Sequence, residues 1–568
     1  MNQAQKTLIK LIIVLLLSGS MLLIPFEEWG IPINTIQSRV IALFVFAALM
    51  WILEVIPIWT TSVLVITLTL LGMSNQSLNF LQVERFDSAA VKAIVADAYG
   101  PAAKPETVQA TQDAVLADMK KQTSLSSAYV RSTINNTILA PVVSGKVTEP
   151  AAKAELAAAA AKLYDGTLSQ RINELNLVSV SKQKSIFATF ADPIIILFLG
   201  GFFLADAATK YRLDINLARV LLKPFGTNPK YVLLGLMSVT AVFSMFMSNT
   251  ATAAMMLALL TPVLALFKPE DRGRAAFALC IPIGANVGGI GTPIGTPPNA
   301  IALKYMQDLG LDVTFGKWMM FGIPFVLIVL LVGWLVLLKM FPISQKSLDL
   351  SKELKGKFLT TPKAIIVYAT FIVTILMWII PKEYHGLDSN SVAIIPIAVF
   401  SITGVIMKKD LKAMSWDVLW LVAGGFALGV ALSETNLAKD MINAIPFDTW
   451  NSIMLLVGAS CICLFMATFM SHTATAALLV PILGGVAGAM MAAGSMDTPG
   501  AVALLVTVAF ASSLGMALPI STPPNAMAYA TGHVEQKGMA ISGTILCLLG
   551  LAITILMMVG LGAVGFFG

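Results

Sequence analysis

The chain has 568 residues, of which 57% are hydrophobic and only 12% charged, and its formal net charge is +6. The apolar residues form long runs, not the short periods of a soluble core, which excludes a soluble globular protein and indicates an integral membrane protein. The basic residues lie in short loops between these runs, which argues against a nucleic-acid partner. All four cysteines lie in apolar segments and the histidines are scattered, so the sequence predicts neither disulfides nor a metal cluster.

Apolar runs close to the roughly 20 residues needed to cross a bilayer predict the membrane-spanning helices. The first run follows Lys6 and Lys10 but has no small-residue cleavage site after it, so we interpret it as a retained helix. Counting further interrupted apolar stretches, we expect an all-α integral membrane protein with about 11 transmembrane helices. The uninterrupted runs lie at 8–26, 37–56, 58–73, 193–208, 316–341, 362–380, 390–407, 414–432 and 537–566.

Clusters of Lys and Arg predict which loops face the cytoplasm of a protein in the cell inner membrane. These clusters lie at the N-terminus and at 209–230, 268–274, 342–361 and 408–412. The N-terminus is therefore expected in the cytoplasm and the segment 74–190 outside. That segment is polar and rich in Ala, Lys and Gln, and predicts a mostly helical extracytoplasmic insertion with a helix-favouring stretch at 150–162.

Three motifs recur in the same order in the two halves of the chain. They are Gly-Gly-Phe at 200 and 424, Ser-(Asn or His)-Thr-Ala-Thr-Ala-Ala at 248 and 471, and Thr-Pro-Pro-Asn-Ala at 296 and 522. The spacings agree as well, at 48 and 47 residues between the first two motifs and 48 and 51 between the last two. Chance repetition of three ordered motifs is improbable, so we interpret the halves as repeats.

Crossing counts predict that 231–267 and 451–489 enter and leave on one side as re-entrant hairpins. Prolines remove donors and clash with the preceding turn, so 275–303 and 500–531 are predicted to be broken helices. An odd number of crossings per repeat gives the second repeat inverted topology, which is typical of alternating-access transporters. The expected organisation is an N-terminal helix (1–36), scaffold helices (37–73), the polar insertion (74–190), the rest of the first repeat (191–341), a cytoplasmic linker (342–361) and the second repeat (362–568).

Irregular backbone at membrane depth is tolerated only where it is buried in protein or lines a cavity. Ser-Asn-Thr at a hairpin tip offers hydroxyls, an amide and freed N–H groups beside helix N-termini, which suits a carboxylate. The carbonyls at the opposite helix ends suit a hard cation such as sodium. The alternative is that these residues only support helix packing, and it would be preferred for a single motif; the ordered duplication favours a binding site.

The paired tips, the paired Thr-Pro-Pro-Asn-Ala breaks and the stretch from Trp51 through Glu54 to Pro57 resemble the divalent-anion/sodium symporter family, over nearly the whole chain except 74–190. This resemblance implies dimeric, elevator-type carriers of dicarboxylates, citrate or sulfate. It also implies two tips that bind substrate, each beside a sodium site.

Carried over by motif, the resemblance implies three sets of residues. The first sodium site would use Ser244, Ser248, Asn249 and the Gly295 carbonyl. The substrate would be bound by Ser248, Asn249, Thr250, Ser471, His472, Thr473, Thr522 and Pro523. The second cation site would be degenerate, at Ala467, Met470, His472 and Ser521, because Ala467 and His472 stand where the family has a hydroxyl residue and an asparagine.

Two readings of His472 stay open. It can bind substrate or supply the positive charge of the missing cation, which would make transport sensitive to pH. It can also be an interior histidine satisfied by a nearby carbonyl, which is the more frequent situation for a lone membrane histidine. Its position inside a duplicated motif favours the functional reading, whereas Glu54 and Asp206 lie near helix ends and are taken as structural.

The sequence therefore predicts a secondary transporter of divalent organic anions, with C4-dicarboxylates as the expected class, coupled to sodium at one site or more. It would be a homodimer in contact with lipid, with no organic cofactor and no enzymatic activity. The variants of this prediction are an obligate anion exchanger with His472 in place of the second cation, or a sulfate or tricarboxylate carrier. A membrane enzyme using Ser471 and His472 lacks a carboxylate to orient the histidine, and a channel would need a continuous polar pore.

Overall fold

The computed structural model describes residues 3–26, 33–83, 88–99, 104–119, 154, 178–264, 267–268, 270–348, 357–437, 440 and 452–567. Across these residues the regular elements are helices, apart from one isolated bridge between Ser74 and Ser181. Nine helical stretches in this part of the chain are long and apolar enough to cross a bilayer. The predicted all-α membrane fold is confirmed.

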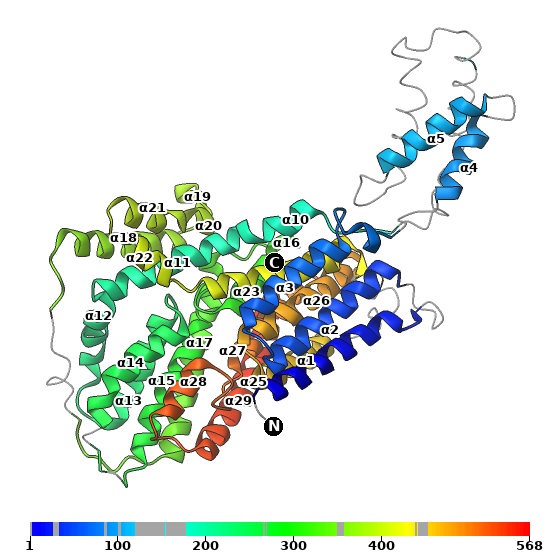
Figure 1. The fold of residues 1–568 in the computed structure, drawn as a ribbon. Coiled ribbons are helices and arrows are strands. Elements are labelled where there is room, and N and C mark those ends of the chain that lie inside the picture. Colours follow the sequence, from blue (N-terminus) through cyan, green and yellow to red (C-terminus); the bar gives the residue numbers. More distant parts are fainter. Residues whose placement is uncertain are drawn as a thin grey trace.

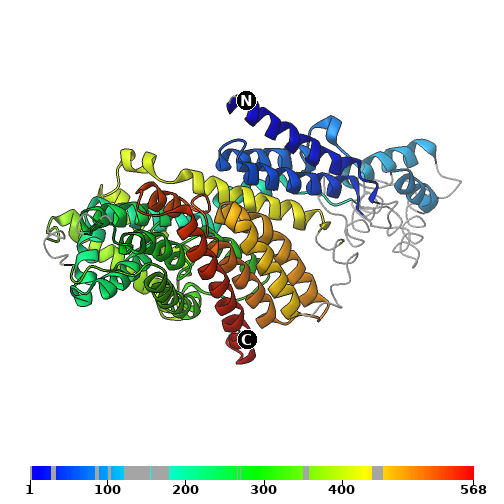
Figure 2. The same ribbon diagram turned by 90° about the horizontal axis from the view of Figure 1, so that it is seen from below.

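The chain begins with α1 (Gln3–Ser20), α2 (Thr35–Leu53) and α3 (Ile58–Met73), drawn in blue in Figures 1 and 2. Helix α2 packs against both of its neighbours. It starts at a capping box in which Asn34 and Gln37 exchange side-chain hydrogen bonds with each other's backbone amides. It ends at Glu54, whose φ of 45° breaks the helix, and Pro57 then begins α3. This break brings the start of α3 to the wall of the central cavity described below.

The predicted insertion contains the helices α4 (Ser88–Tyr99) and α5 (Pro105–Met119), which pack together and project from the membrane body in Figure 1. Its two ends meet, because the Ser181 amide donates to the Met73 carbonyl and the Asn75 amide to the Ser181 carbonyl. The helix-favouring stretch 150–162 lies, apart from Ala154, outside the described residues. The insertion is thus joined to the membrane body beside α3 and α10 (Gln183–Ala188). It also contacts the body through the Leu81 carbonyl, which accepts from Arg39 of α2, and through Ser179 Oγ, which accepts from the Asn436 side-chain amide.

The first half of the membrane body runs from α11 to α17. Glycines allow the closest approach of α13 to α15, since a methyl on Gly288 would lie 2.4 Å from the Ala241 Cα and one on Gly284 2.7 Å from the Met237 carbonyl. The helices are α11 (Pro193–Lys210), α12 (Leu213–Leu222), α13 (Pro229–Ser244), α14 (Asn249–Leu264), α15 (Gly273–Gly289), α16 (Pro297–Asp308) and α17 (Phe315–Met340).

The second half runs from α18 to α29, and α27 packs against both α25 and α29. The predicted span 390–407 is shorter than expected, because it ends at Ile402, before Gly404 with its φ of 62°. It is also interrupted at Ala393, one turn before Pro396, which cannot donate to the Val392 carbonyl, and the Ala393 backbone meets Gly200 of α11 there. The helices are α18 (Pro362–Ile379), α19 (Lys382–His385), α20 (Ser389–Val392), α21 (Ile394–Ile402), α22 (Lys408–Ala413), α23 (Trp416–Glu434), α25 (Ser452–Phe469), α26 (His472–Ala492), α27 (Thr498–Leu514), α28 (Pro523–Ala530) and α29 (Gln536–Ala563).

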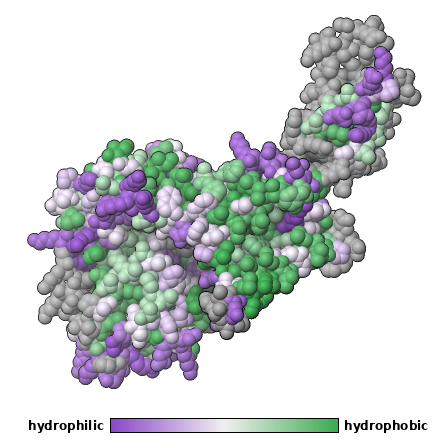
Figure 3. Space-filling model, viewed as in Figure 1, coloured by the Kyte–Doolittle hydropathy of each residue, from purple (hydrophilic) through white to green (hydrophobic). Residues whose placement is uncertain are grey.

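On the face shown in Figure 3, green apolar surface covers a broad part of the helical body. Helix α18, for example, exposes Ile365, Ile372 and Leu376 on its outer side. Large exposed apolar surfaces are expected where lipid, not water, surrounds the protein. The helices nearest the centre of the body, α15 and α27, are instead buried along nearly their whole length, and both end at the duplicated motifs.

Candidate functional site

The first Ser-Asn-Thr motif lies at the interruption between α13 and α14. Ser248 caps α14, because its hydroxyl accepts a hydrogen bond from the Ala251 amide at 3.2 Å. The Ser244 hydroxyl at the end of α13 lies 2.7 Å from both Asn249 Oδ1 and the Ala285 carbonyl. A hydroxyl has one proton, so with the amide in this orientation only one of these two oxygens receives a hydrogen bond. The other pair of oxygens then lies 2.7 Å apart without a proton between them, and a cation bound by both oxygens would remove this repulsion.

Further oxygens gather around the two glycines at the first helix break. A methyl on Gly289 would lie 2.7 Å from Asn249 Oδ1 and 3.0 Å from the Gly295 carbonyl oxygen. One on Gly295 would lie 2.5 Å from the Gly289 carbonyl oxygen and 2.8 Å from that of Ser244. Neutral oxygens from α13, α14 and both sides of the break therefore surround one small volume. This donor set fits a hard monovalent cation such as sodium.

The second tip has the same plan but different chemistry. Ser471 caps α26 by accepting from the Ala474 amide at 3.1 Å. The His472 Nε2 lies 2.8 Å from the Gly515 carbonyl oxygen, and Nε2 must be the donor because a carbonyl only accepts. Aligning the two Thr-Pro-Pro-Asn motifs makes Gly515 the counterpart of Gly289. An N–H group therefore meets the carbonyl whose counterpart in the first half belongs to the oxygen cluster.

The remaining residues of the degenerate second cation site lie beside this contact. Ala467, the counterpart of Ser244, has no side-chain oxygen and approaches Gly515 so closely that a methyl there would lie 2.4 Å from the Ala467 carbonyl oxygen. Ser521 donates to the Thr468 carbonyl at 2.7 Å, and Met470 is buried. In this half the polar groups are thus satisfied by one another.

The asparagine of each Thr-Pro-Pro-Asn motif bonds to carbonyls freed by the helix break. Asn299 donates to the carbonyls of Gly289, Ile290 and Thr292 at 2.8 to 3.2 Å. Asn525 donates to the carbonyls of Met516 and Leu518 at 2.7 and 3.1 Å. These bonds explain how an irregular backbone persists in the apolar interior, since unpaired buried carbonyls are costly.

Both tips and both breaks line a single cavity of about 240 Å³. All eight residues predicted to bind substrate are in its wall, together with Gly295 and Ser521. The other predicted cation-site residues, Ser244, Ala467 and Met470, are not among the lining residues. The sequence predictions had missed the other wall residues, among them Ile58, Phe198, Phe202, Asn286, Thr296, Asp417, Val418 and Leu421.

Two of these missed residues are polar groups in or at the end of apolar helices. Asn286 lies inside α15 and is fully buried, and its amide donates to Thr522 Oγ1 at 3.2 Å and Asn525 Oδ1 at 3.1 Å. It therefore joins the two halves at the back of the cavity. Asp417 lies in the first turn of α23. Asn286 and Asp417 could have been predicted as site residues because each is a polar residue within an apolar run.

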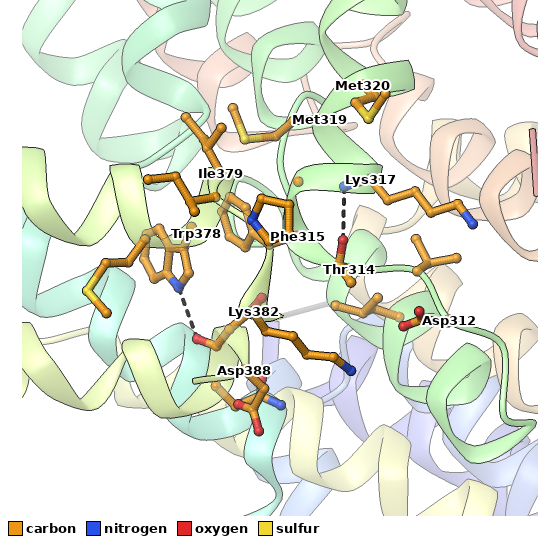
Figure 4. A pocket seen from close by; sticks show the side chains of 18 of the residues that line it. Asp312, Thr314, Phe315, Lys317, Met319, Met320, Trp378, Ile379, Lys382 and Asp388 are labelled. Atoms are coloured by element: carbon orange, nitrogen blue, oxygen red, sulfur yellow. Dashed lines mark hydrogen bonds between the residues drawn. The ribbon is translucent and has the colours of Figure 1, made fainter. Parts of the chain in front are cut away.

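A second and larger cavity, about 930 Å³, lies between α17 and α18 (Figure 4). Its wall is mainly apolar, with the Phe315 and Trp378 rings stacked at 4.7 Å. Lys317 and Lys382 lie at its edge, but the Trp378 indole donates to the backbone of Ser389 and not into the cavity. The duplicated motifs contribute no residue to this wall. We therefore assign the functional site to the smaller cavity.

Comparisons with known proteins identify the family of the chain. A family model described as "Citrate transporter" matches residues 149–502. The chain is 33% identical over 393 residues to an "Uncharacterized transporter" of Haemophilus influenzae, covering 66% of this chain and 81% of that one. It is 30% identical over 415 residues to the "Sodium-dependent dicarboxylate transporter SdcS" of Staphylococcus saprophyticus, covering 66% and 78%.

A further relative is the "Inorganic phosphate transporter PHO87" of Saccharomyces cerevisiae, which is 30% identical over 359 residues but of which the match spans only 38%. These relatives are transporters, so the enzyme hypothesis for Ser471 and His472 is rejected. The family model covers more than half of the chain, and the resemblance inferred from the duplicated motifs is confirmed. The chain is a multi-pass membrane transporter that belongs to the citrate transporter family.

Proposed function

We propose that this protein is a sodium-coupled secondary transporter of small divalent organic anions, with C4-dicarboxylates as the preferred class. The observation that supports this most strongly is the meeting of four helix N-termini at one cavity, at Asn249, Pro297, His472 and Pro523. Helix N-termini carry partial positive charge and free amides, which attract anions. Two opposed tips suit a molecule with two carboxylates, and about 240 Å³ suits a small one.

Sodium coupling at the first tip is supported by the oxygen cluster of Ser244, Asn249, Gly289 and Gly295. Among the described residues, no Lys or Arg lines the cavity. A dianion there needs compensating positive charge, and a bound sodium ion beside the tip would supply it. The name of the staphylococcal relative, a sodium-dependent dicarboxylate transporter, supports the same coupling.

The contact of His472 with Gly515 favours a second candidate, an obligate anion exchanger. If the imidazole N–H permanently takes the place of a second cation, the carrier without substrate keeps the contact between His472 and Gly515. Its transport then depends less on bound sodium. Exchange would then dominate over net symport. The same contact also fits a histidine with a purely structural role. A transport measurement therefore distinguishes the symporter from the exchanger.

The path of the substrate follows from the predicted orientation in the inner membrane. The cavity wall includes Ile58 and Asp417, at the starts of α3 and α23, which follow segments expected at the cytoplasmic side. This supports an inward-facing state. In the proposed cycle of a homodimer, the hairpins and broken helices of α13–α17 and α25–α29 move together past α2, α3, α11, α18 and α23.

The test is uptake of radiolabelled succinate into proteoliposomes that contain the purified protein. Four conditions are compared, with and without an inward sodium gradient, and with and without internal succinate. Uptake that requires the sodium gradient supports the symporter, and uptake that requires only internal succinate supports the exchanger. Uptake in empty liposomes measures leakage.

The choice of substrate is tested in the same vesicles. Unlabelled succinate, malate, citrate, sulfate and phosphate are offered as competitors. Strong competition by the C4-dicarboxylates is the expected result. If succinate is not taken up and labelled sulfate or citrate is, the dicarboxylate assignment is wrong and the carrier belongs to the sulfate or tricarboxylate variant.

A further inference from the structure

The charges around the cavity are unusual for an anion site. Among the described lining residues there is no Lys or Arg, but there is one carboxylate, Asp417. It is exposed and shares a face of α23 with Val418 and Leu421, which also line the cavity. Within the described part of the chain, the Asp417 carboxylate has no ion-pair partner and no hydrogen-bond partner. An unneutralised negative charge therefore faces the space that the anion would occupy.

A purely structural role explains little of this arrangement. An acidic residue in the first turn of a helix interacts favourably with the helix dipole. Asp417 is however not the capping residue of α23, which is Ser415, and it accepts no backbone amide. Helix α23 packs against both α3 and the tip helix α26, so its first turn lies at the edge of the cavity beside Ile58.

We propose that Asp417 is a charge-selecting residue that disfavours substrates with more than two negative charges. The inference rests on the proposed function as an anion carrier. Coulomb repulsion is proportional to the charge of the substrate, so each substrate charge weakens binding by the same factor. A dianion is weakened by the square of this factor and a trianion by its cube. The ratio of dianion affinity to trianion affinity therefore falls by this factor once for each unit of negative charge removed from position 417.

The factor follows from Coulomb's law. Two unit charges about 8 Å apart in water-like surroundings change a binding constant about two- to threefold. Removing the Asp417 charge should lower the preference for a dianion over a trianion by about this factor. Reversing it should lower the preference by the square, about four- to ninefold. The helix N-termini attract each anion to the same extent in every variant, so their contribution cancels when the variants are compared.

The experiment measures displacement of labelled succinate from the purified protein in saturating sodium, by unlabelled succinate and by tricarballylate. The pH is alkaline, so that both competitors are fully ionised. The variants are Asp417→Asn and Asp417→Lys, with Asp417→Glu as the charge-preserving control. Glu54→Gln is the matched control, because Glu54 lies at the α2–α3 break near the same end of α3 but does not line the cavity.

The ratio of tricarballylate to succinate inhibition constants should fall in the order wild type, Asn, Lys, and should stay unchanged in both controls. The difference in this ratio between the wild type and Asp417→Asn should also shrink as salt is raised, because salt screens the Asp417 charge. Normal succinate binding with the same ratio in the wild type, Asn and Lys would overturn the inference alone. Absence of succinate binding by the wild type would refute the proposed function and the inference with it.

Discussion

Adding one methyl group at Gly289 should block the first cation site while leaving the fold intact. The new Cβ would lie 2.7 Å from Asn249 Oδ1 and 3.0 Å from the Gly295 carbonyl oxygen, in the middle of the proposed sodium ligands. The Asn249 oxygen is the end of a side chain and can rotate away. Gly289 does not have a positive φ, so alanine is compatible with the backbone there. The amide of Asn249 should therefore leave the site.

The expected loss follows from the value of one ligand. A polar contact to a charged group contributes about 1.5–3 kcal/mol, so losing the Asn249 oxygen should weaken sodium affinity by about 10- to 100-fold. The net cost to stability should be small, because the preference of a helix for alanine over glycine, up to about 1 kcal/mol, offsets the tight 3.0 Å approach to the Gly295 carbonyl oxygen. Half-saturating sodium should rise, and the unfolding temperature should change little.

The assay is succinate uptake in proteoliposomes as a function of external sodium, beside thermal unfolding of the same preparation. Gly458→Ala is the matched control, because a methyl on that glycine of α25 would meet no atom within 4 Å. An unchanged sodium curve in a folded Gly289→Ala protein would show that the cation does not bind among these oxygens.

Three further changes test other parts of the site. Asn249→Ala removes the same ligand without filling the space, so half-saturating sodium should rise by about 10- to 100-fold with the fold retained; normal sodium dependence in this variant would contradict the site. His472→Asn removes the imidazole that meets Gly515, so uptake should become more dependent on sodium and less dependent on internal anion; if both dependences stay as in the wild type, the histidine is structural. Gly429→Ala would place a methyl 1.4 Å from the Tyr305 hydroxyl oxygen, which lies in a slot between α23 and α26. The free energy of unfolding should therefore fall by about 1–3 kcal/mol, and adding Tyr305→Leu should restore part of the lost melting temperature. Equal melting temperatures for the wild type and Gly429→Ala would show that the slot is not closely packed.

Most of the fold and most of the polar side chains in the cavity wall could be predicted from the sequence because their causes are local. Apolar runs reveal spans, prolines reveal breaks, and a duplicated motif marks irregular backbone that an apolar interior would otherwise reject. All eight predicted substrate residues accordingly lie in one cavity wall. The interruption at Ala393 has a local cause in Pro396, which lacks the N–H for the Val392 carbonyl, whereas the close approach of Ala393 to Gly200 in a distant helix has no local signal.

The roles of particular polar groups also depended on contacts between distant segments. Asn286 joins the two halves through residues 236 and 239 positions away, and no spacing rule connects them. The Gly515 carbonyl that meets His472 is 43 positions away. The sequence allowed two interpretations of this histidine, and it could not identify the carbonyl to which the His472 N–H donates.

The most direct test of the central claim is an experimental structure of the protein in saturating sodium and succinate. The account predicts density for an elongated anion between the tips at Ser248–Thr250 and Ser471–Thr473, with a separate ion peak between Asn249 and the Gly295 carbonyl. Succinate density in the cavity between α17 and α18, with empty space between the tips, would contradict it.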